Sequence, residues 1–195
     1  MDDTTHLLLA AGVGDATAFS AFVRATQGDV WRFCAHLVDP QAADDLTQDT
    51  YVRVARSMHG FRGDAAAGTW LMTIARRVCA DHLRGMVRRR RHERVTEPAA
   101  LAQLPTAHHD EPATTDLDRL LAGLEPDRRE AMVLTQVLGM TYAEAATTVG
   151  VPIGTIRSRV ARARAELVAA MDRAEEHEQG RLRMDHQRRT APSPW

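Results

Sequence analysis

The chain contains no lysine and no asparagine, only two cysteines, few aromatic residues and no long apolar run. All 25 basic residues are therefore arginine, which we attribute to the codon bias of a GC-rich genome. No apolar run approaches the roughly 18 residues that a membrane-spanning helix requires. Cys34 and Cys79 lack the close spacing of a metal-binding pair, so we expect both to be small core residues that stay unbridged in a reducing compartment.

The amino terminus shows no export signal. Residues 1–5 are acidic and lack a basic segment followed by an apolar run and a small-residue cleavage site. We therefore expect a cytoplasmic protein without membrane insertion. The 195 residues, 44% of them hydrophobic, are enough for one ordinary domain or two small ones.

The net charge of −1 is distributed unevenly along the chain. Residues 71–95 carry eight arginines against two acids, a net charge of +6, and residues 153–173 carry five arginines against two acids, a net charge of +3. Between them, residues 97–130 carry eight acids against three arginines, a net charge of −5. Because salt limits the reach of a charge to about 10 Å, two basic clusters indicate two contacts on one nucleic acid. An arginine run alone would also fit a solvated helix end.

Hydrophobic periodicity predicts an all-α fold, with neither strand-like alternation nor an internal repeat. Amphipathic segments lead up to Pro40, a second helix is expected over 41–58, and a third begins near Thr69 and runs toward the arginine cluster. The predicted domains are 1–95, a linker over 96–115, a second helical domain over 116–174, and a polar, disordered tail over 175–195. The linker is rich in alanine, proline and acid and lacks a helical period.

The second domain contains a helix-turn-helix pattern. Thr141 with Glu144 three residues later predicts a capping box, which opens a helix that Gly150 closes. A further helix is expected to begin near Thr155. Two short helices joined through a glycine turn are typical of the helix-turn-helix, whose second helix enters the major groove of DNA.

The second helix of this motif is expected to have a buried stripe and an opposite, DNA-facing side. The stripe consists of Ile156, Val160, Ala163, Leu167 and Met171. The candidate DNA contacts are Thr155, Arg157, Ser158, Arg159, Ala161, Arg162 and Arg164. Arginine binds guanine through two hydrogen bonds, whereas flanking arginines meet phosphates. We assign base contacts to Arg157 and Arg162 and phosphate contacts to Arg159 and Arg164.

Three stretches carry the sequence patterns of a known family. They are DPQAADDLTQDTYVRV over 39–54, FRGD over 61–64 followed by TWLMTIARRVCADHLR over 69–84, and residues 124–167 with GTIRSRVARAR inside them. In this order they resemble regions 2.2, 2.3 with 2.4, and 4 of the extracytoplasmic-function group of bacterial RNA polymerase sigma factors. The resemblance spans most of the chain and implies two small helical domains, sigma region 2 and sigma region 4, joined by a flexible acidic linker.

The resemblance also implies a function. A member of this family is an initiation subunit without catalytic residues, which binds core RNA polymerase, directs it to promoters and promotes strand opening. Docking on the polymerase is implied for Asp44, Asp45, Gln48, Asp49, Val52 and Arg56. Contacts to the minus-ten element are implied for Phe61, Arg62, Asp64, Thr73, Arg76, Arg77, Arg84 and Arg88. The implied partners are the clamp helices and flap of the core polymerase, promoter DNA and an anti-sigma factor, and we expect no cofactor and no metal.

Two departures from the family pattern concern the minus-ten contacts. Residues 65–68 read AAAG, where many members have a Ser-x-Phe group beside the loop that holds a flipped base. Arg77 stands where members often have asparagine, and its guanidinium can stack on a base or bind a phosphate. We expect Trp70 to be a core residue.

Two other functions fit parts of the sequence. An independent helix-turn-helix repressor or activator would dimerise to read two half-sites, but no long dimer helix is obvious. A nuclease could use Asp44, Asp45 and Asp49 to hold a magnesium ion, although these acids lie on the helix that resembles the docking helix.

Overall fold

The computed structural model describes residues 2–96 and 116–190, with side chains over 2–89 and 117–174. These ranges contain helices and no strand, which confirms the predicted all-α fold. The linker over 97–115 lies outside the described residues, as do residues 191–195 at the end of the predicted tail.

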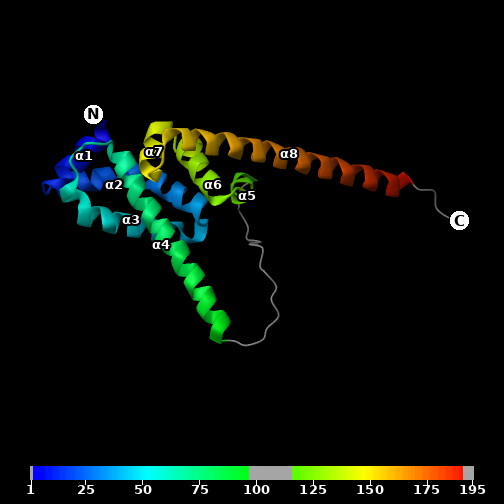
Figure 1. Cartoon of the computed structure of the whole chain (residues 1–195), viewed down its shortest axis with the longest axis horizontal. Coiled ribbons are helices and arrows are strands. Elements are labelled where there is room, and N and C mark those ends of the chain that lie inside the picture. Colours follow the sequence, from blue (N-terminus) through cyan, green and yellow to red (C-terminus); the bar gives the residue numbers. More distant parts are fainter. Residues whose placement is uncertain (1, 97–115, 191–195) are drawn as a thin grey trace.

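The first half of the chain forms a bundle, which we call lobe 1 (Figure 1). Its elements are α1 (Asp3–Gly12), α2 (Ala16–Leu37), α3 (Pro40–Ser57), the 3₁₀ turn η1 (Met58–Gly60) and α4 (Ala67–Thr96). Asp2, Asp15 and Asp39 accept backbone N–H groups at the starts of α1, α2 and α3. Helix α1 was not predicted from the sequence. It is held to the start of α4 by a hydrogen bond from the N–H of Ala67 to the Thr5 hydroxyl, at 2.9 Å.

The second half forms lobe 2, which contains the predicted helix-turn-helix. Its elements are α5 (Asp116–Ala122), α6 (Pro126–Met132), the π-helical turn η2 (Val133–Val137), α7 (Tyr142–Val149) and α8 (Ile153–Thr190). The capping box is confirmed, because Thr141 N–H donates to Glu144 Oε2 at 2.8 Å and Glu144 N–H donates to Thr141 Oγ1 at 3.2 Å. Gly150 ends α7 in the left-handed conformation, at φ 78°.

Helix α8 differs from its prediction at both ends. It begins two residues before Thr155 and continues to Thr190, through a segment that we expected to be a disordered tail. Its predicted stripe is buried at Ile156, Val160 and Ala163, but Met171 is 50% exposed. The later part of α8 projects from the rest of the molecule (Figure 1), and the exposure of Met171 shows that the core no longer covers the stripe at that position.

The two lobes pack against each other. Helix α7 lies on α4, and α2 contacts α5, α6 and η2. Arg76 Nε donates to Glu130 Oε1 at 2.7 Å, and His36 Nδ1 lies 2.7 Å from Asp118 Oδ1. The buried residues form one cluster that includes both lobes. We expected the lobes to be connected through the linker alone, and the charge count could not reveal that acids of lobe 2 would face basic residues of lobe 1.

The capping box of α7 provides a test of the fold of lobe 2. We expect Thr141→Ala to lower the free energy of unfolding by about 1 kcal/mol, because the first turn of α7 loses its side-chain acceptor. The control Thr147→Ala removes a hydroxyl from an exposed position in the last turn of the same helix. Urea titration followed by circular dichroism measures both variants. Equal losses would contradict a specific role for the cap.

Candidate polymerase and promoter interfaces

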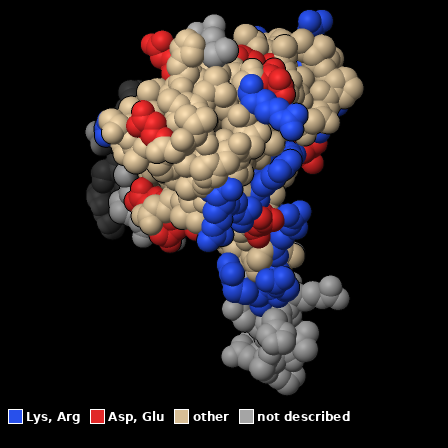
Figure 2. All heavy atoms as spheres, turned by 90° about the vertical axis from the view of Figure 1, so that its left-hand side faces the viewer, with Lys and Arg blue, Asp and Glu red and all other residues tan. Residues whose placement is uncertain are grey.

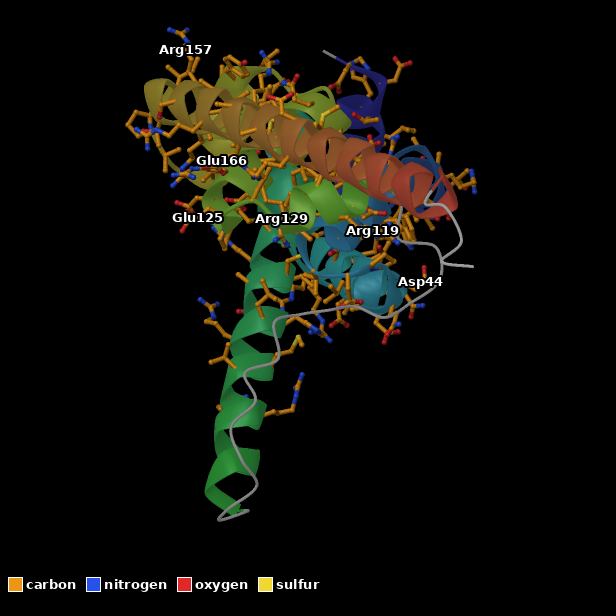
Figure 3. The ribbon with its side chains drawn as sticks, turned by 90° about the vertical axis from the view of Figure 1, so that its right-hand side faces the viewer. Asp44, Arg119, Glu125, Arg129, Arg157 and Glu166 are labelled. Carbon is orange, nitrogen blue, oxygen red and sulfur yellow. The ribbon has the colours of Figure 1, made fainter. Side chains whose placement is uncertain are left out.

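Helix α3 has one buried side and one exposed side. Ala43, Leu46, Thr50 and Val54 are buried in lobe 1. All six residues predicted to dock on the polymerase are exposed on the other side: Asp44, Asp45, Gln48, Asp49, Val52 and Arg56. Figure 3 shows Asp44 on α3, away from the recognition helix α8. We call this set the α3 face.

A tryptophan from α2 borders the α3 face. Trp31 Nε1 donates to Asp44 Oδ1 at 2.8 Å, and the Trp31 side chain remains 39% exposed. Together with Val52, which is 47% exposed, it gives an acidic surface two apolar contact points. Mixed surfaces of this kind suit a protein partner better than DNA. Trp31 was not predicted as part of this surface. In the sequence it stands between Val30 and Phe33, two buried residues of α2, and nothing there indicates a contact with α3.

Helix α4 carries exposed arginines along the side that faces away from the core. Arg77, Arg84, Arg88 and Arg89 are exposed, and Figure 2 shows basic side chains following this helix. Arg84 donates to Asp81, which also accepts from Arg53 of α3 at 2.7 Å. These two guanidinium groups hold the pKa of Asp81 below its usual value. Such a row of exposed cations can contact the phosphates of a nucleic-acid backbone.

The loop before α4 holds the other residues predicted at the minus-ten element. Phe61 packs against Trp70 with ring centroids 5.3 Å apart and planes tilted by 52°. Both rings are half-buried, which agrees with Trp70 as a packing residue, whereas Arg62 and Asp64 are exposed. Thr73 is half-buried within α4, and its hydroxyl donates to the Thr69 carbonyl at 3.0 Å.

Lobe 2 covers the first half of α4, including one predicted DNA contact. Glu130 is only 7% exposed, and its carboxylate binds the guanidinium of Arg76. Nearer the start of α4, a cavity of about 210 Å³ is lined by Thr69 and Met72 of α4 and by Met140 before α7. In this arrangement Arg76 is engaged by protein, while Arg77, Arg84, Arg88 and Arg89 remain at the surface.

The recognition helix α8 presents some predicted contacts outward and uses others in packing. Arg157, Ala161 and Arg162 are exposed, and Arg157 points away from the molecule in Figure 3. Arg159, by contrast, pairs with Asp127 of α6, and Arg164 donates to Gln136 Oε1 at 2.7 Å.

The two remaining predicted residues at the start of α8, Thr155 and Ser158, are half-buried, and the Ser158 hydroxyl donates to the Thr155 carbonyl. Farther along α8, Glu166 pairs with Arg128 of α6. Together with the pairs of Arg159 and Arg164, this pair braces the recognition helix against α6 and η2.

Three acids from the segment that separates the basic clusters take part in this packing. The pairs are Asp118 with His36, Asp127 with Arg159, and Glu130 with Arg76. The first and third join the lobes, and the second holds α8 on α6. Sequence analysis identified the excess of acid but not its partners, because the pairs are separated by 32 to 82 positions in the chain.

The described part of the chain offers no evident metal site. No group of three or more His, Cys, Asp or Glu side chains within it could hold a metal ion. Asp44, Asp45 and Asp49 therefore do not form such a group with each other. No helix among the described residues is both long and apolar enough to cross a membrane.

The ion pair between the lobes leads to a prediction about DNA affinity. We expect Glu130→Gln to raise the affinity of the full chain for DNA by about fivefold, or roughly 1 kcal/mol, because Arg76 becomes available to a phosphate. Fluorescence anisotropy at low salt measures the change. The control Glu125→Gln removes an equal charge at an exposed position of lobe 2. An equal rise in the control would assign the effect to net charge and contradict release of Arg76.

Comparison with known proteins identifies a known region in each of the two lobes. Two family models match, Sigma-70 region 2 over residues 22–91 and Sigma-70, region 4 over residues 114–167. The chain is 46% identical over 165 residues to the ECF RNA polymerase sigma factor SigC of Mycobacterium tuberculosis, covering 85% of this chain and 89% of the relative. It is 32% identical to the RNA polymerase sigma-H factor of Pseudomonas aeruginosa, covering 81% of this chain and 88% of the relative.

A solved structure shares the fold. The sigma factor RpoE of Bartonella quintana, in a co-crystal with the anti-sigma factor NepR, matches with a TM-score of 0.67 and 28% identity over 79% of this chain and 96% of that chain. Sequence and fold therefore point to the same family. With both sigma regions present and in order, the chain belongs to the ECF sigma factors, the promoter-directing initiation subunits of RNA polymerase.

Proposed function

We propose that the α3 face docks on the clamp helices of core RNA polymerase while the two lobes contact separate promoter elements. The observation that supports this most strongly is that the six residues of the α3 face are all exposed on one side of α3, while the exposed arginines lie on a separate helix, α4. A surface of net negative charge is repelled by DNA and attracted to a basic protein surface. The polymerase and the promoter can therefore bind lobe 1 at the same time.

For lobe 1, we propose that α4 and the preceding loop read and open the minus-ten element. The contributing residues are Phe61, Arg62, Asp64, Thr73, Arg76, Arg77, Arg84 and Arg88. Bases captured outside the duplex would offset an unstacking cost of a few kcal/mol, so opening needs no nucleotide hydrolysis. In this account the chain acts in the cytoplasm as a binding subunit and contributes no catalytic residue.

For lobe 2, we propose that α8 enters the major groove of the minus-thirty-five element and that lobe 2 also contacts the polymerase flap. Arg157 and Arg162 are exposed and can reach base edges, while Ala161 leaves room for close approach to the groove. Arg159 and Arg164 are positioned by Asp127 and Gln136, which suits contacts to phosphates at a fixed register.

This function requires the lobes to separate when the chain joins the polymerase. Lobe 2 covers the start of α4 and binds Arg76, so the minus-ten contacts cannot form completely while the lobes are packed together. We infer that docking of the two lobes on separate polymerase elements favours the separated form, since a ligand shifts an equilibrium toward the state it binds better. The contacts between the lobes include polar pairs that water or DNA can replace.

We also infer an anti-sigma factor as a partner. The Bartonella relative was crystallised with such a protein. This chain, like that relative, contains both sigma lobes, and its α3 face and α4 arginines are open to a competitor of polymerase or DNA. Isolation of the chain from its cells with bound partners tests this inference.

A reconstituted transcription assay tests the proposed function. The full chain is mixed with sigma-free core polymerase and genomic promoter fragments, and the transcripts are mapped. We expect transcripts that begin at specific sites and depend on the chain. Cleavage of the DNA would favour the nuclease hypothesis, and dimeric footprints without polymerase would favour the repressor hypothesis. Either result without specific transcripts contradicts the proposal.

Base recognition by α8 can be tested at one residue. We expect Arg162→Ala to weaken binding to a preferred minus-thirty-five duplex about tenfold, within the roughly 1–3 kcal/mol assigned to a bidentate base contact. Binding to an unrelated duplex should change much less. The control Arg24→Ala removes an exposed arginine from α2 of lobe 1. Equal weakening on both duplexes would refute base recognition by Arg162.

Docking through the α3 face can be tested by reversing one charge. We expect Asp49→Arg to weaken binding to core polymerase about tenfold, because a cation would face the basic partner surface. The control Asp172→Arg makes the same change at an exposed position of α8. Competition against a labelled wild-type chain measures both affinities. An unchanged affinity for Asp49→Arg would remove α3 from the interface.

A further inference from the structure

The two cysteines, which are separated by 45 positions in the sequence, meet in the core of lobe 1. Cys34 lies near the end of α2, and Cys79 lies in the middle of α4. Both side chains are fully buried, as the sequence analysis expected. Their sulfur atoms are 3.7 Å apart, and the Cys79 thiol donates to the Cys34 sulfur. The sequence offered no sign of this contact, because the two residues share no local motif.

The geometry permits a covalent bond after a small movement. A disulfide joins its sulfurs at about 2.05 Å, so the pair must approach by roughly 1.7 Å. Cys34 is three residues from the last residue of α2, and the chain leaves the helix at Val38. The end of a helix can shift more easily than its centre, because fewer backbone hydrogen bonds hold it.

The two sulfurs differ in their tendency to lose a proton. The hydrogen bond from Cys79 is the main cause that lowers the pKa of Cys34, and the Thr47 hydroxyl acts in the same direction. The pKa of Cys79 is raised, first because its proton is held by Cys34 and second because it is buried. Since the thiolate is the nucleophile, the hydrogen bond that Cys34 accepts favours Cys34 as the sulfur that is oxidised first, with Cys79 as the thiol that resolves the product.

A cavity at the contact between the lobes reaches the pair at Cys79. Its volume is about 350 Å³, and Cys79 forms part of its wall together with Leu83 of α4, Val38 at the end of α2, and Arg129 and Glu130 of α6. This volume is several times that of a small oxidant such as hydrogen peroxide. A buried core thiol is ordinarily inert. This pair differs in two respects, a second sulfur in contact and a cavity beside it.

We propose that Cys34 and Cys79 are a site of reversible oxidation, at which hydrogen peroxide converts the two thiols into an intramolecular disulfide. Peroxide from the cavity meets the pair at Cys79, and the Cys34 thiolate, whose sulfur lies 3.7 Å from that of Cys79, attacks one of the peroxide oxygens. The O–O bond breaks, and the departing hydroxide takes up the proton that Cys34 released and leaves as water. Cys34 then carries a sulfenic acid.

Cys79 completes the reaction. Its sulfur attacks the Cys34 sulfur, the S–S bond forms and the S–O bond breaks, and the leaving hydroxide takes the Cys79 proton to form a second water. Two thiols are oxidised and one peroxide is reduced to two waters. A dithiol reductant reverses the change. Cys79 lies one turn after Arg76 on α4, so the bond forms beside the ion pair that joins the lobes.

Mass spectrometry of the full wild-type chain tests this proposal without any substitution. After treatment with hydrogen peroxide, we expect peptide mapping to show one Cys34–Cys79 bridge in each chain, with a loss of about 2 Da that dithiothreitol restores. Two free thiols at peroxide concentrations that oxidise exposed Met171 would overturn the proposal. Bridges between chains in place of the internal bridge would also overturn it.

Single variants test the order of the two steps. In Cys79→Ser, the sulfenic acid on Cys34 has no resolving thiol, so a dimedone probe should label Cys34. In Cys34→Ser, we expect little labelling of Cys79. Comparable circular dichroism spectra establish that both variants fold. Labelling of Cys79 in Cys34→Ser with no labelling of Cys34 in Cys79→Ser would refute Cys34 as the nucleophile.

Discussion

The ion pair between Arg76 and Glu130 lies where α4 must both pack into a core and present arginines at its surface. One side of this helix supplies the core of lobe 1 through Leu71, Ala75 and Val78, and its other side carries arginines. Arg76 lies between the two sides, half-buried, and its charge requires a partner in either environment. In the free chain the partner is a carboxylate of lobe 2. We propose that a phosphate or a base replaces this carboxylate on a promoter, so that the same guanidinium has a partner in the packed form and in the DNA-bound form.

Packing of the lobes has a simple physical basis in the composition of the chain. The segment between the basic clusters is acidic, and three of its acids pair with His36, Arg76 and Arg159 on its two sides. Apolar residues at the end of α2 and before α7 add contact area that would otherwise meet water. The polar pairs between the lobes contribute modestly to net stability, because the cost of removing these groups from water offsets much of their attraction. Contacts of that kind hold two domains together without preventing their separation by a stronger partner.

Much of this structure could be predicted from periodicity and caps. The helix-turn-helix followed from Thr141, Glu144 and Gly150, and the exposed side of α3 followed from the spacing of its apolar residues. These features are local, so short windows of sequence determine them. The family patterns then assigned the lobes to known regions. Helix α1 was missed because it has only 10 residues and lies before the first motif that the sequence analysis used.

Long-range contacts could not be predicted in the same way. The partner of Arg76, the exposure of Trp31 and the meeting of Cys34 with Cys79 depend on how helices far apart in sequence pack. Met171 was predicted to be buried but is exposed, because the apolar stripe of α8 continues past the core that buries its first residues. Periodicity gives the side of a helix, but only the tertiary structure determines what covers that side.

We propose that the chain passes from packed lobes to separated lobes when it joins the polymerase. Distance measurement by pulsed electron paramagnetic resonance tests it directly, with spin labels on Ser20→Cys in lobe 1 and Thr147→Cys in lobe 2, both at exposed positions. The account predicts a short, narrow distance distribution in the free chain and a longer one with core polymerase and promoter DNA. The same short distance in both states would contradict it.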